Sequence, residues 1–466
     1  MMKKQVFNPF LPGYEYIPDG EAHVFNNRLY IFGSHDRFGG TDYCEEDYVC
    51  WSAPVEDLTD WKYEGVIYRK EQHPYKIGTG YLYAPDVAKG PDGRYYLYYS
   101  VADSSIISVA VCDEPAGQYE YYGDVRYTNG HVAGSHKADY FEFDPAVLVD
   151  DDGKIYLYSG SGQKSNEQFG HPVVGAFVRE LDADMLTLLT EPTIIMVADE
   201  DRAKPNFFEG SSIRKINGLY YFIYFSTDIT GLNYCTSKYP NRDFVYRGRL
   251  HSSSDIGLND RPPSNAVSFI GNNHGSIECI NGNYYVFNHR NTNRTYFSRQ
   301  AVAEPITIQT DGSIRQVEST SCGLNGGPLS EKGEYLAYIA CNLMNERVNR
   351  VRNPFTAPYM TQEEVTGFEY PVQHIAEIKN GCLVGFKYFK IPDARKIAIK
   401  IRGNVIGKIN VLLEEEGSPV AEIPVNISTN EWVVCENTFT TNMEVFPIFF
   451  QFEGEGSLDM LSFTIS

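Results

Sequence analysis

Four carboxylates and one imidazole recur along this chain, one in each of five similar segments, and together they are equipped for acid–base chemistry. They are Asp19, Asp86, Asp144, Glu209 and His274. Two carboxyl groups across a cleft are the usual equipment for cleaving a glycosidic bond, because a protonated one donates to the leaving oxygen and an ionised one activates water. Crowding raises the pKa of one member of such a set. A carboxylate cluster also suits a hard cation such as calcium, so the residue types alone leave both chemistries open.

Each of these residues precedes a short segment that occurs five times and is typical of a β-hairpin. The segment is a strand, a tight turn rich in Asn, Asp and Gly, and a strand dense in aromatic residues. The copies lie at 22–34, 87–100, 146–160, 212–226 and 276–290. Aligned on Tyr30, Tyr96, Tyr156, Tyr221 and Tyr285, they are separated by 66, 60, 65 and 64 residues. This period suits a four-stranded blade with its loops and exceeds the roughly 40–45 residues of a WD40 unit. The repeat therefore predicts a five-bladed β-propeller.

The place of the ionisable residues within the repeat predicts that they meet in space. Each lies ten to twelve residues before its tyrosine, at the start of the first strand of the hairpin. Because the innermost strands of a propeller run along its axis, equivalent positions converge on one mouth of the channel, where ligands usually bind. The alternative is that acidic residues at strand starts cap turns, as Asp commonly does. Five residues in register favour a site over five independent caps.

Aromatic residues flank the predicted site, and their planes suit the apolar C–H faces of sugar rings. They are Tyr14, Tyr16, Phe38, Tyr81, Tyr83, Phe141, Phe207 and Phe208. The alternative for each one is packing within the propeller, because aromatic residues favour strands. The pattern predicts a saccharide ligand without deciding which of these side chains contact it.

Composition and charge exclude several partners. The chain has 466 residues with 61 acidic against 40 basic side chains, a net charge of -21, so we predict no nucleic-acid partner. No apolar run approaches the ~18 residues of a membrane span, and we predict no membrane partner. The start of the chain, MMKKQVFNPF, lacks the apolar core of a signal peptide. Nine scattered cysteines without a C-x-x-C pair are typical of reduced thiols. A cytoplasmic location is expected unless a leader has been removed, and the oligomeric state is left open.

Beyond the repeat, the chain predicts a second β domain. Residues 348–360 resemble a Pro-punctuated connector, and seven short strand-like segments follow at roughly 10–15-residue spacing, as in a β-sandwich. We therefore predict an all-β chain, with a five-bladed propeller over 1–345 and a jelly-roll-like sandwich over 346–466. Trp432 is expected in the core of the sandwich rather than on a sugar-binding surface.

Five motifs within 1–345 resemble those of glycoside hydrolase family 43, propeller enzymes that act on arabinose- and xylose-containing glycans. In chain order they are NPFLPGYEYIPDGEAHVF, Tyr-Ala-Pro-Asp-Val at 83–87, Phe-Asp-Pro at 143–145, FEGSSIRKINGLYYFIYFS and NHGSIECINGNYYVFNHR. The resemblance implies that Asp19 is the general base and Glu209 the general acid, with Asp144 raising the pKa of the acid and orienting it. It also implies that His274 helps to hold an axial metal ion, most often calcium.

Two positions depart from the family pattern. Gly20 follows the base where the family commonly has Pro, and Tyr83 stands where it has Trp before Ala-Pro-Asp. Neither change removes a catalytic group, so both bear on the shape of the sugar subsite.

The resemblance implies hydrolysis with inversion, releasing α-L-arabinofuranosyl or β-D-xylosyl units from plant-type oligosaccharides or polysaccharides. Predicted substrate contacts are Asp36, Tyr83, Asp86 and Arg290, with Arg294 a further candidate and a surface ion pair the alternative for the arginines. Three other functions stay open: galactofuranosidase or galactosidase activity, a retaining enzyme, and a carbohydrate-binding propeller without catalysis. The C-terminal domain resembles carbohydrate-binding module family 6 more weakly.

Overall fold

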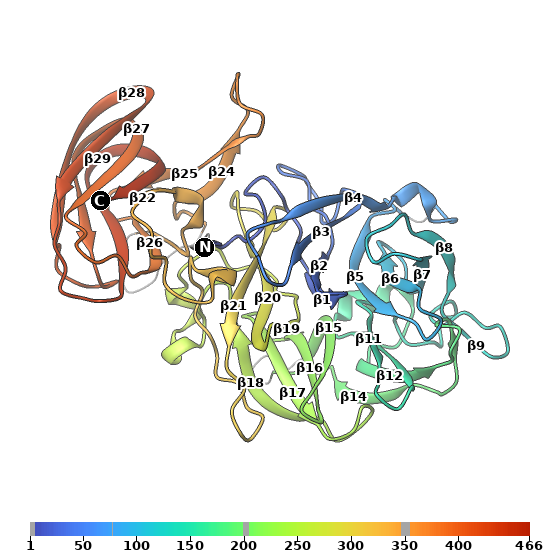
Figure 1. The fold of residues 1–466 in the computed structure, drawn as a ribbon. Helices are drawn as coiled ribbons and strands as arrows, with labels where there is room; N and C mark the ends of the chain where they lie inside the picture. Colours follow the sequence, from blue (N-terminus) through green and yellow to red (C-terminus); the bar gives the residue numbers. More distant parts are fainter. Residues whose placement is uncertain (1–4, 77, 199–204, 346–354) are drawn as a thin grey trace.

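The computed structural model describes residues 5–76, 78–198, 205–345 and 355–466, and these form two β domains (Figure 1). Five sheets surround one axis in the first domain, and the second domain lies beside them. The helical elements described are short 3-10 turns: η1 (Lys70–Gln72), η2 (Lys164–Phe169), η3 (Leu258–Asp260), η4 (Pro263–Asn265), η5 (Gly323–Asn325) and η6 (Ala337–Ile339). Within the same residues, none of the helices has the length and apolar character that a bilayer crossing requires.

The five sheets are the five predicted blades, which confirms the propeller. Blade I contains β1 (Glu21–Phe25), β2 (Arg28–Phe32), β3 (Tyr48–Pro54) and β4 (Lys62–Tyr68). Blade II contains β5 (Leu82–Lys89), β6 (Tyr95–Val101), β7 (Ile107–Cys112) and β8 (Glu120–Asp124). Blade III contains β9 (Arg126–Tyr127), β10 (Ala146–Val149), β11 (Ile155–Ser161), β12 (Gly175–Leu181), β13 (Thr187–Leu188) and β14 (Thr193–Val197). Blade IV contains β15 (Phe207–Ile216), β16 (Leu219–Ser226), β17 (Leu232–Ser237) and β18 (Val245–His251). Blade V contains β19 (Ile277–Ile280), β20 (Asn283–Asn291) and β21 (Arg299–Ile306).

The aligned tyrosines occupy one structural position, the second strand of each blade. They are Tyr30 on β2, Tyr96 on β6, Tyr156 on β11, Tyr221 on β16 and Tyr285 on β20, and all are buried. Turn chemistry fixes the register of these hairpins. Asn217 and Gly218 have φ of 51° and 77°, and Asn281 and Gly282 have φ of 51° and 80°. Two successive positive φ angles give the turn whose twist matches that of the strands, and Asn-Gly adopts it readily.

The residues ahead of β1 hold the last blade against the first. Gly20 forms a parallel bridge with Gly275, just before β19. Further out, the Asn8 side chain donates to the Ala303 carbonyl at 2.9 Å and accepts from the Ala303 backbone N–H at 3.0 Å. Apolar residues of blades I and V also share one core cluster. Closing the ring in this way brings the starts of all five inner strands to the same end of the channel.

The second domain depends on three long, bent strands. Its elements are β22 (Gly333–Leu336), β23 (Asn342–Met344), β24 (Tyr359–Glu363), β25 (Val372–Lys379), β26 (Leu383–Phe389), β27 (Lys396–Leu412), β28 (Ala421–Thr438) and β29 (Phe446–Ile465). Six segments predicted as separate strands merge into β27, β28 and β29. Gly407 pairs with Gly454 where β27 crosses β29, and a Cβ on either glycine would lie within 2.5 Å of a backbone oxygen of the other strand. The glycines therefore bend the strands where the sequence suggested breaks.

Strand pairing moves the domain boundary earlier than residue 345. β22 pairs with β29 and β23 pairs with β26, so 333–344 already belong to the sheet of the second domain. Much of the predicted connector, up to residue 354, lies outside the described residues. Trp432 is half-buried rather than in the core, with the Arg402 guanidinium 4.4 Å from the centre of its ring.

A buried lysine fixes the second domain to the propeller. Lys387 on β26 is 4% exposed, and its ammonium lies 2.7 Å from Glu318 and 3.3 Å from Asp255, both on the propeller side. The neighbouring Tyr388 hydroxyl donates to Glu318 at 2.6 Å. The two domains are thus joined by charged groups in a buried interface, in addition to the connecting chain.

Replacing Lys387 by Met is expected to lower the free energy of unfolding by about 3–5 kcal/mol, because the buried Asp255 carboxylate loses its counter-charge. Urea unfolding followed by fluorescence measures this. The matched control is Lys379→Met, which removes an exposed partner of Glu377 at 2.9 Å and should cost less than about 1 kcal/mol. Equal losses in the two variants would contradict a structural role for Lys387.

Candidate active site

A cavity of about 650 Å³ opens where the inner strands begin, and four of the five residues predicted to converge lie in its wall. They are Asp19, Asp144, Glu209 and His274. Asp19 and Asp144 lie just ahead of β1 and β10, His274 lies ahead of β19, and Glu209 lies within β15. The structure therefore brings together residues of blades I, III, IV and V at one end of the channel.

Asp19 is held as a carboxylate. It is buried, and its oxygens accept hydrogen bonds from Arg299 Nη1 at 2.9 and 3.2 Å. Its backbone N–H donates to His289 Nδ1 at 3.2 Å. Burial by itself raises the pKa of Asp19, but the positive charge of Arg299 outweighs burial and holds the pKa below its usual value. An ionised carboxylate of this kind is suited to accept a proton from water.

Glu209, in contrast to Asp19, is favoured in its protonated form. Burial, and then the negative charge of Asp19, raise the pKa of Glu209 to about 7, against a hydrogen bond from Gln163 Nε2 that lowers it. Asp144 is also buried, and its pKa is raised by burial and by the charges of Glu209 and Asp19. The Gly210 backbone N–H donates to Asp144 Oδ2 at 2.9 Å, which places this carboxyl beside the strand segment that carries Glu209. At neutral pH the Asp144–Glu209 pair thus retains a proton while Asp19 carries charge.

The backbone is unusual at two of these carboxyl groups. Asp19 and Asp144 have φ of 58° and 45°, in the left-handed region. Asp tolerates this conformation better than most residues, and such outliers concentrate at functional sites. The same local turn therefore precedes the inner strands of blades I and III.

His274 fits a role as a ligand of a cation. The side chain is buried, its Nδ1 lies 3.8 Å from Asp144 Oδ2, and its Nε2 has no hydrogen-bond partner among the described residues. Burial lowers the pKa of His274, so the imidazole is neutral and offers a lone pair. A buried ring nitrogen without a partner, close to carboxylates, is a donor set that suits a cation surrounded by water.

Aromatic side chains make up much of the cavity wall. They are Tyr43, Tyr83, Phe141, Phe143, Phe169, Phe208, Phe225, Tyr296 and Phe355. Three of them, Tyr83, Phe141 and Phe208, were predicted from their position near the ring. Phe207 instead lies in the core beneath the wall. Phe143 and Phe225 lie within the Phe-Asp-Pro motif and the fourth repeat copy. Tyr43, Phe169 and Tyr296 come from segments that sequence spacing does not connect to the repeat, and Phe355 follows the propeller altogether.

The substrate-contact role predicted for Asp36 needs correction. Asp36 is fully buried behind the cavity, where its carboxylate accepts from Arg299 Nε at 2.8 Å and Arg299 Nη2 at 2.9 Å. Arg299 in turn holds Asp19. Asp36 therefore positions the arginine that sets the charge of Asp19, and it does not line the cavity.

The prediction for Arg290 chose the wrong arginine. Its guanidinium donates to the carbonyls of Tyr338 and Ala340 at 2.6 and 2.7 Å, at the interface with the second domain. Arg294 also bonds to that domain, through the Ala357 carbonyl. The cavity arginine is Arg299, at the start of β21, which the sequence analysis missed. Because β21 also carries Gln300 and Glu304, no sequence signal singled out Arg299.

Asp86 also lies away from the cavity. One carboxylate oxygen lies 2.7 Å from His23 Nε2, and the other accepts from the Val147 backbone N–H at 2.7 Å. Asp86 pairs with Tyr98, two residues from the aligned Tyr96. Glu209 pairs with Phe225, four residues from the aligned Tyr221, so Asp86 lies further along its inner strand than Glu209 does.

A propeller whose channel holds one ionised and one protonated carboxyl in a sugar-sized, aromatic-walled cavity has the equipment of a glycosidase. Residues 7–314 match the model of "Glycosyl hydrolases family 43". The chain belongs to this family, and it is a glycoside hydrolase.

Relatives support the assignment over the whole length. The chain is 46% identical to a "Xylosidase/arabinosidase" of Thermoclostridium stercorarium, over 100% of this chain and 99% of the relative. It is 25% identical to an "Arabinoxylan arabinofuranohydrolase" of Paenibacillus polymyxa, over 96% of this chain and 71% of the relative. The match at both ends shows that the two-domain arrangement is shared with the first of these proteins.

Solved structures share the fold. The GH43_1 enzyme from Xanthomonas citri, complexed with xylotriose, has a TM-score of 0.55 at 26% identity, covering 69% of this chain and 96% of its own. A β-xylosidase/α-arabinofuranosidase from a compost microbial metagenome, in a calcium-free form with xylotriose, has a TM-score of 0.53 at 27% identity, covering 66% and 96%. Both matches extend over about the length of the propeller.

Proposed function

We propose that this chain releases terminal or branching α-L-arabinofuranosyl or β-D-xylosyl units from plant-type oligosaccharides or polysaccharides, with inversion at the anomeric carbon. The observation that carries the proposal is that Asp19 and Glu209 line one cavity in surroundings that shift their pKa values in opposite directions. The pKa of Asp19 is lowered and that of Glu209 is raised to about 7. The xylosidase/arabinosidase and arabinofuranohydrolase names of the relatives support a pentose substrate.

The proposed reaction is a single displacement. Glu209 donates its proton to the glycosidic oxygen as the bond from that oxygen to the anomeric carbon breaks. Asp19 accepts a proton from a water molecule whose oxygen bonds to the anomeric carbon from the opposite face. Asp144, beside Glu209, shares a proton with it, so that the pair retains one proton near neutral pH. Proton return from Asp19 to Glu209 through solvent restores the starting state.

A panel of aryl glycosides tests the substrate class. The 4-nitrophenyl α-L-arabinofuranoside and β-D-xylopyranoside are expected to be hydrolysed, with the β-D-galactofuranoside slower than either. Proton NMR of the first product formed should show the inverted anomer. A preference for the galactofuranoside would overturn the pentose assignment, and a retained anomer would favour the retaining alternative.

The pH dependence of kcat/KM follows from the two carboxyl groups. Glu209 acts only when protonated, so kcat/KM should fall about tenfold per pH unit above pH 7, where this group loses its proton. Asp19 acts only when ionised, and because its pKa is lowered, the acidic limb should lie below about pH 4. Initial rates on an arabinoxylo-oligosaccharide, whose leaving group needs protonation, between pH 3 and 9 with pre-incubation controls for stability, measure both limbs. A rate that keeps rising to pH 9 would contradict the role of Glu209.

We also propose that His274 helps to hold a calcium ion in the channel. Support comes from its neutral imidazole with an unpartnered Nε2 and from the carboxylates of Asp19 and Asp144 nearby. Because calcium prefers oxygen, water molecules would supply most of its ligands. When bound, the ion would supply positive charge near the sugar-binding end of the channel.

Chelation tests the calcium proposal. Treatment with EGTA is expected to lower both Tm and kcat, and added calcium should restore them, because the ion binds the folded state. In the His274→Gln variant, Tm should no longer respond to EGTA or calcium. An unchanged Tm in the wild-type protein after exhaustive chelation would contradict the site.

A further inference from the structure

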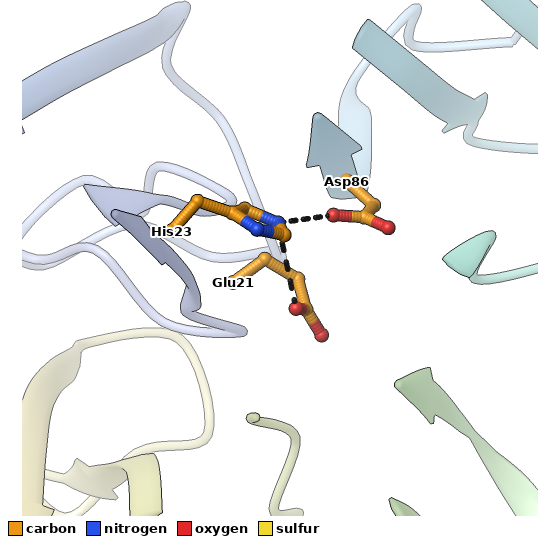
Figure 2. Close-up of side chains that lie close together, drawn as sticks. All are labelled: Glu21, His23 and Asp86. Atoms are coloured by element: carbon orange, nitrogen blue, oxygen red, sulfur yellow. Dashed lines mark hydrogen bonds and ion pairs between the residues drawn. The ribbon is translucent and has the colours of Figure 1, made fainter. Parts of the chain in front are cut away.

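A second cluster of ionisable side chains lies deeper in the channel than the cavity carboxyls. Glu21 and His23 come from β1 of blade I, and Asp86 comes from β5 of blade II (Figure 2). One ligand atom from each residue lies within 4.8 Å of the other two. His23 Nε2 is 2.7 Å from Asp86 Oδ1 and 4.0 Å from Glu21 Oε2. Figure 2 shows the His23 ring between the two carboxyl groups, with a dashed line to one oxygen of each.

The cluster carries more negative charge than its surroundings neutralise. Glu21 and Asp86 are 1% and 0% exposed. Arg214 on β15 lies 2.8 Å from Glu21 Oε2, but its Nε is also 3.8 Å from Glu278 of blade V. One guanidinium therefore faces three carboxyl groups. Burying unpaired carboxylates is costly unless a proton or a cation compensates them.

One oxygen of the cluster lacks a partner. Arg214 and the Glu21 carboxylate meet through Oε2, whereas Oε1 is buried and accepts no hydrogen bond from any described residue. Buried oxygens without a donor are uncommon and indicate an absent ligand, water or ion. Asp86 is held in place by backbone N–H groups of Val87 and Val147, both at 2.7 Å, so its position does not depend on His23.

We propose that Glu21, His23 and Asp86 bind one divalent first-row transition-metal ion, such as Zn²⁺ or Mn²⁺, which ties blade I to blade II. One imidazole and two carboxylates are a borderline donor set that suits these ions, whereas calcium prefers oxygen alone. Bonds of about 2.1 Å place neighbouring ligand atoms roughly 3–3.5 Å apart, between the two separations from His23 Nε2. No residue of this site is shared with the calcium site proposed at His274.

Binding exchanges a hydrogen bond for the metal ion. The hydrogen bond between His23 Nε2 and Asp86 breaks, its proton moves to Nδ1 or to solvent, and the nitrogen lone pair and one oxygen of each carboxylate bond the metal. Water would complete the coordination. The His23 side chain is 13% exposed, so the site can be reached from the channel without unfolding.

Cobalt is a suitable probe, because its visible absorption reports an imidazole-containing site directly. After chelation, the full-length wild-type protein should bind one equivalent of Co²⁺ or Zn²⁺ by isothermal titration calorimetry, with a rise in Tm and Co²⁺ d–d bands. His23→Gln and Glu21→Gln should each weaken binding at least tenfold. His274→Gln is the matched control and should bind Co²⁺ as the wild type does.

Three results would overturn the proposal. In the first, the wild-type protein binds Co²⁺ and Zn²⁺ no more tightly than His23→Gln does. In the second, binding is lost in His274→Gln but kept in His23→Gln and Glu21→Gln. Should the β1 variants not fold, zinc-soaked wild-type crystals decide the question by anomalous diffraction. A peak between Glu21, His23 and Asp86 supports the site, and a peak elsewhere or no peak rejects it.

Discussion

Replacing Glu209 by Gln is expected to lower kcat/KM on arabino- and xylo-oligosaccharides by about 10²–10⁴-fold, because an amide cannot protonate the leaving oxygen. The loss should depend on the leaving group. An aryl glycoside of an acidic phenol needs little protonation, so its kcat/KM should fall much less than that of an oligosaccharide. Steady-state kinetics on both substrates measures the contrast. The buried position of Glu209, which raises its pKa to about 7, is what makes the group an acid at neutral pH.

Glu304→Gln is the matched control for this substitution. Glu304 is 2% exposed and burial raises its pKa, yet it lies outside the cavity and accepts hydrogen bonds from Thr320. Activity of this variant should stay within a few-fold of the wild type. A loss in Glu209→Gln that is the same for both leaving groups, or unchanged hydrolysis, would remove Glu209 as the acid. Unchanged hydrolysis would also remove the basis for assigning the reaction to this cavity.

Replacing Asp19 by Asn is expected to lower kcat/KM by about 10²–10⁴-fold on every substrate, because water then has no base to accept its proton. Azide should restore turnover, since it is an anionic nucleophile that needs no base. Arg299 Nη1, 2.9 Å from Asp19, leaves positive charge where the carboxylate stood and favours an anion there. The product should be a glycosyl azide of inverted configuration, identified by NMR and mass spectrometry.

Replacing Asp19 by Asn should also lower the pKa of Glu209. The charge of Asp19 is one of the causes that raise the pKa of Glu209, so removing it should shift the basic limb of the azide reaction below pH 7. Asp36→Asn is the control, because Asp36 contacts Arg299 behind the cavity and leaves no room for azide. A glycosyl azide of retained configuration, or equal rescue of both variants, would contradict the assignment of Asp19 as the base.

Local sequence was sufficient to predict most of the propeller. Strand alternation and Asn-Gly turns depend on neighbouring residues, so the hairpin and its tyrosine could be read in each blade. Periodicity then implied that Asp19, Asp144, Glu209 and His274 share one end of the channel, and all four line one cavity. The long strands of the second domain were harder to predict, because Gly407 and Gly454 look like breaks until their close pairing is seen.

Contacts between distant segments could not be predicted in this way. Arg290 and Arg299 are both basic residues of blade V, and only the tertiary structure shows that one points to the second domain and the other to the cavity. Asp86 matches the ring in sequence but lies about two residues further along its inner strand than Glu209 does, and it meets His23 and Glu21 instead. A shift of a few residues along an inner strand changes how deep a side chain lies in the channel.

The sequence by itself determined that three of the four aligned carboxyl groups, those of Asp19, Asp144 and Glu209, gather at the channel mouth, because a repeated hairpin places equivalent residues equivalently. Only the tertiary structure decided which of them carries charge. Asp19 is ionised because Arg299, 280 residues away, lies against it, and Arg299 is held there by Asp36. Glu209 keeps its proton because it is buried near that charge. Electrostatic energy depends on separation and burial in space, and neither can be read from distance along the chain.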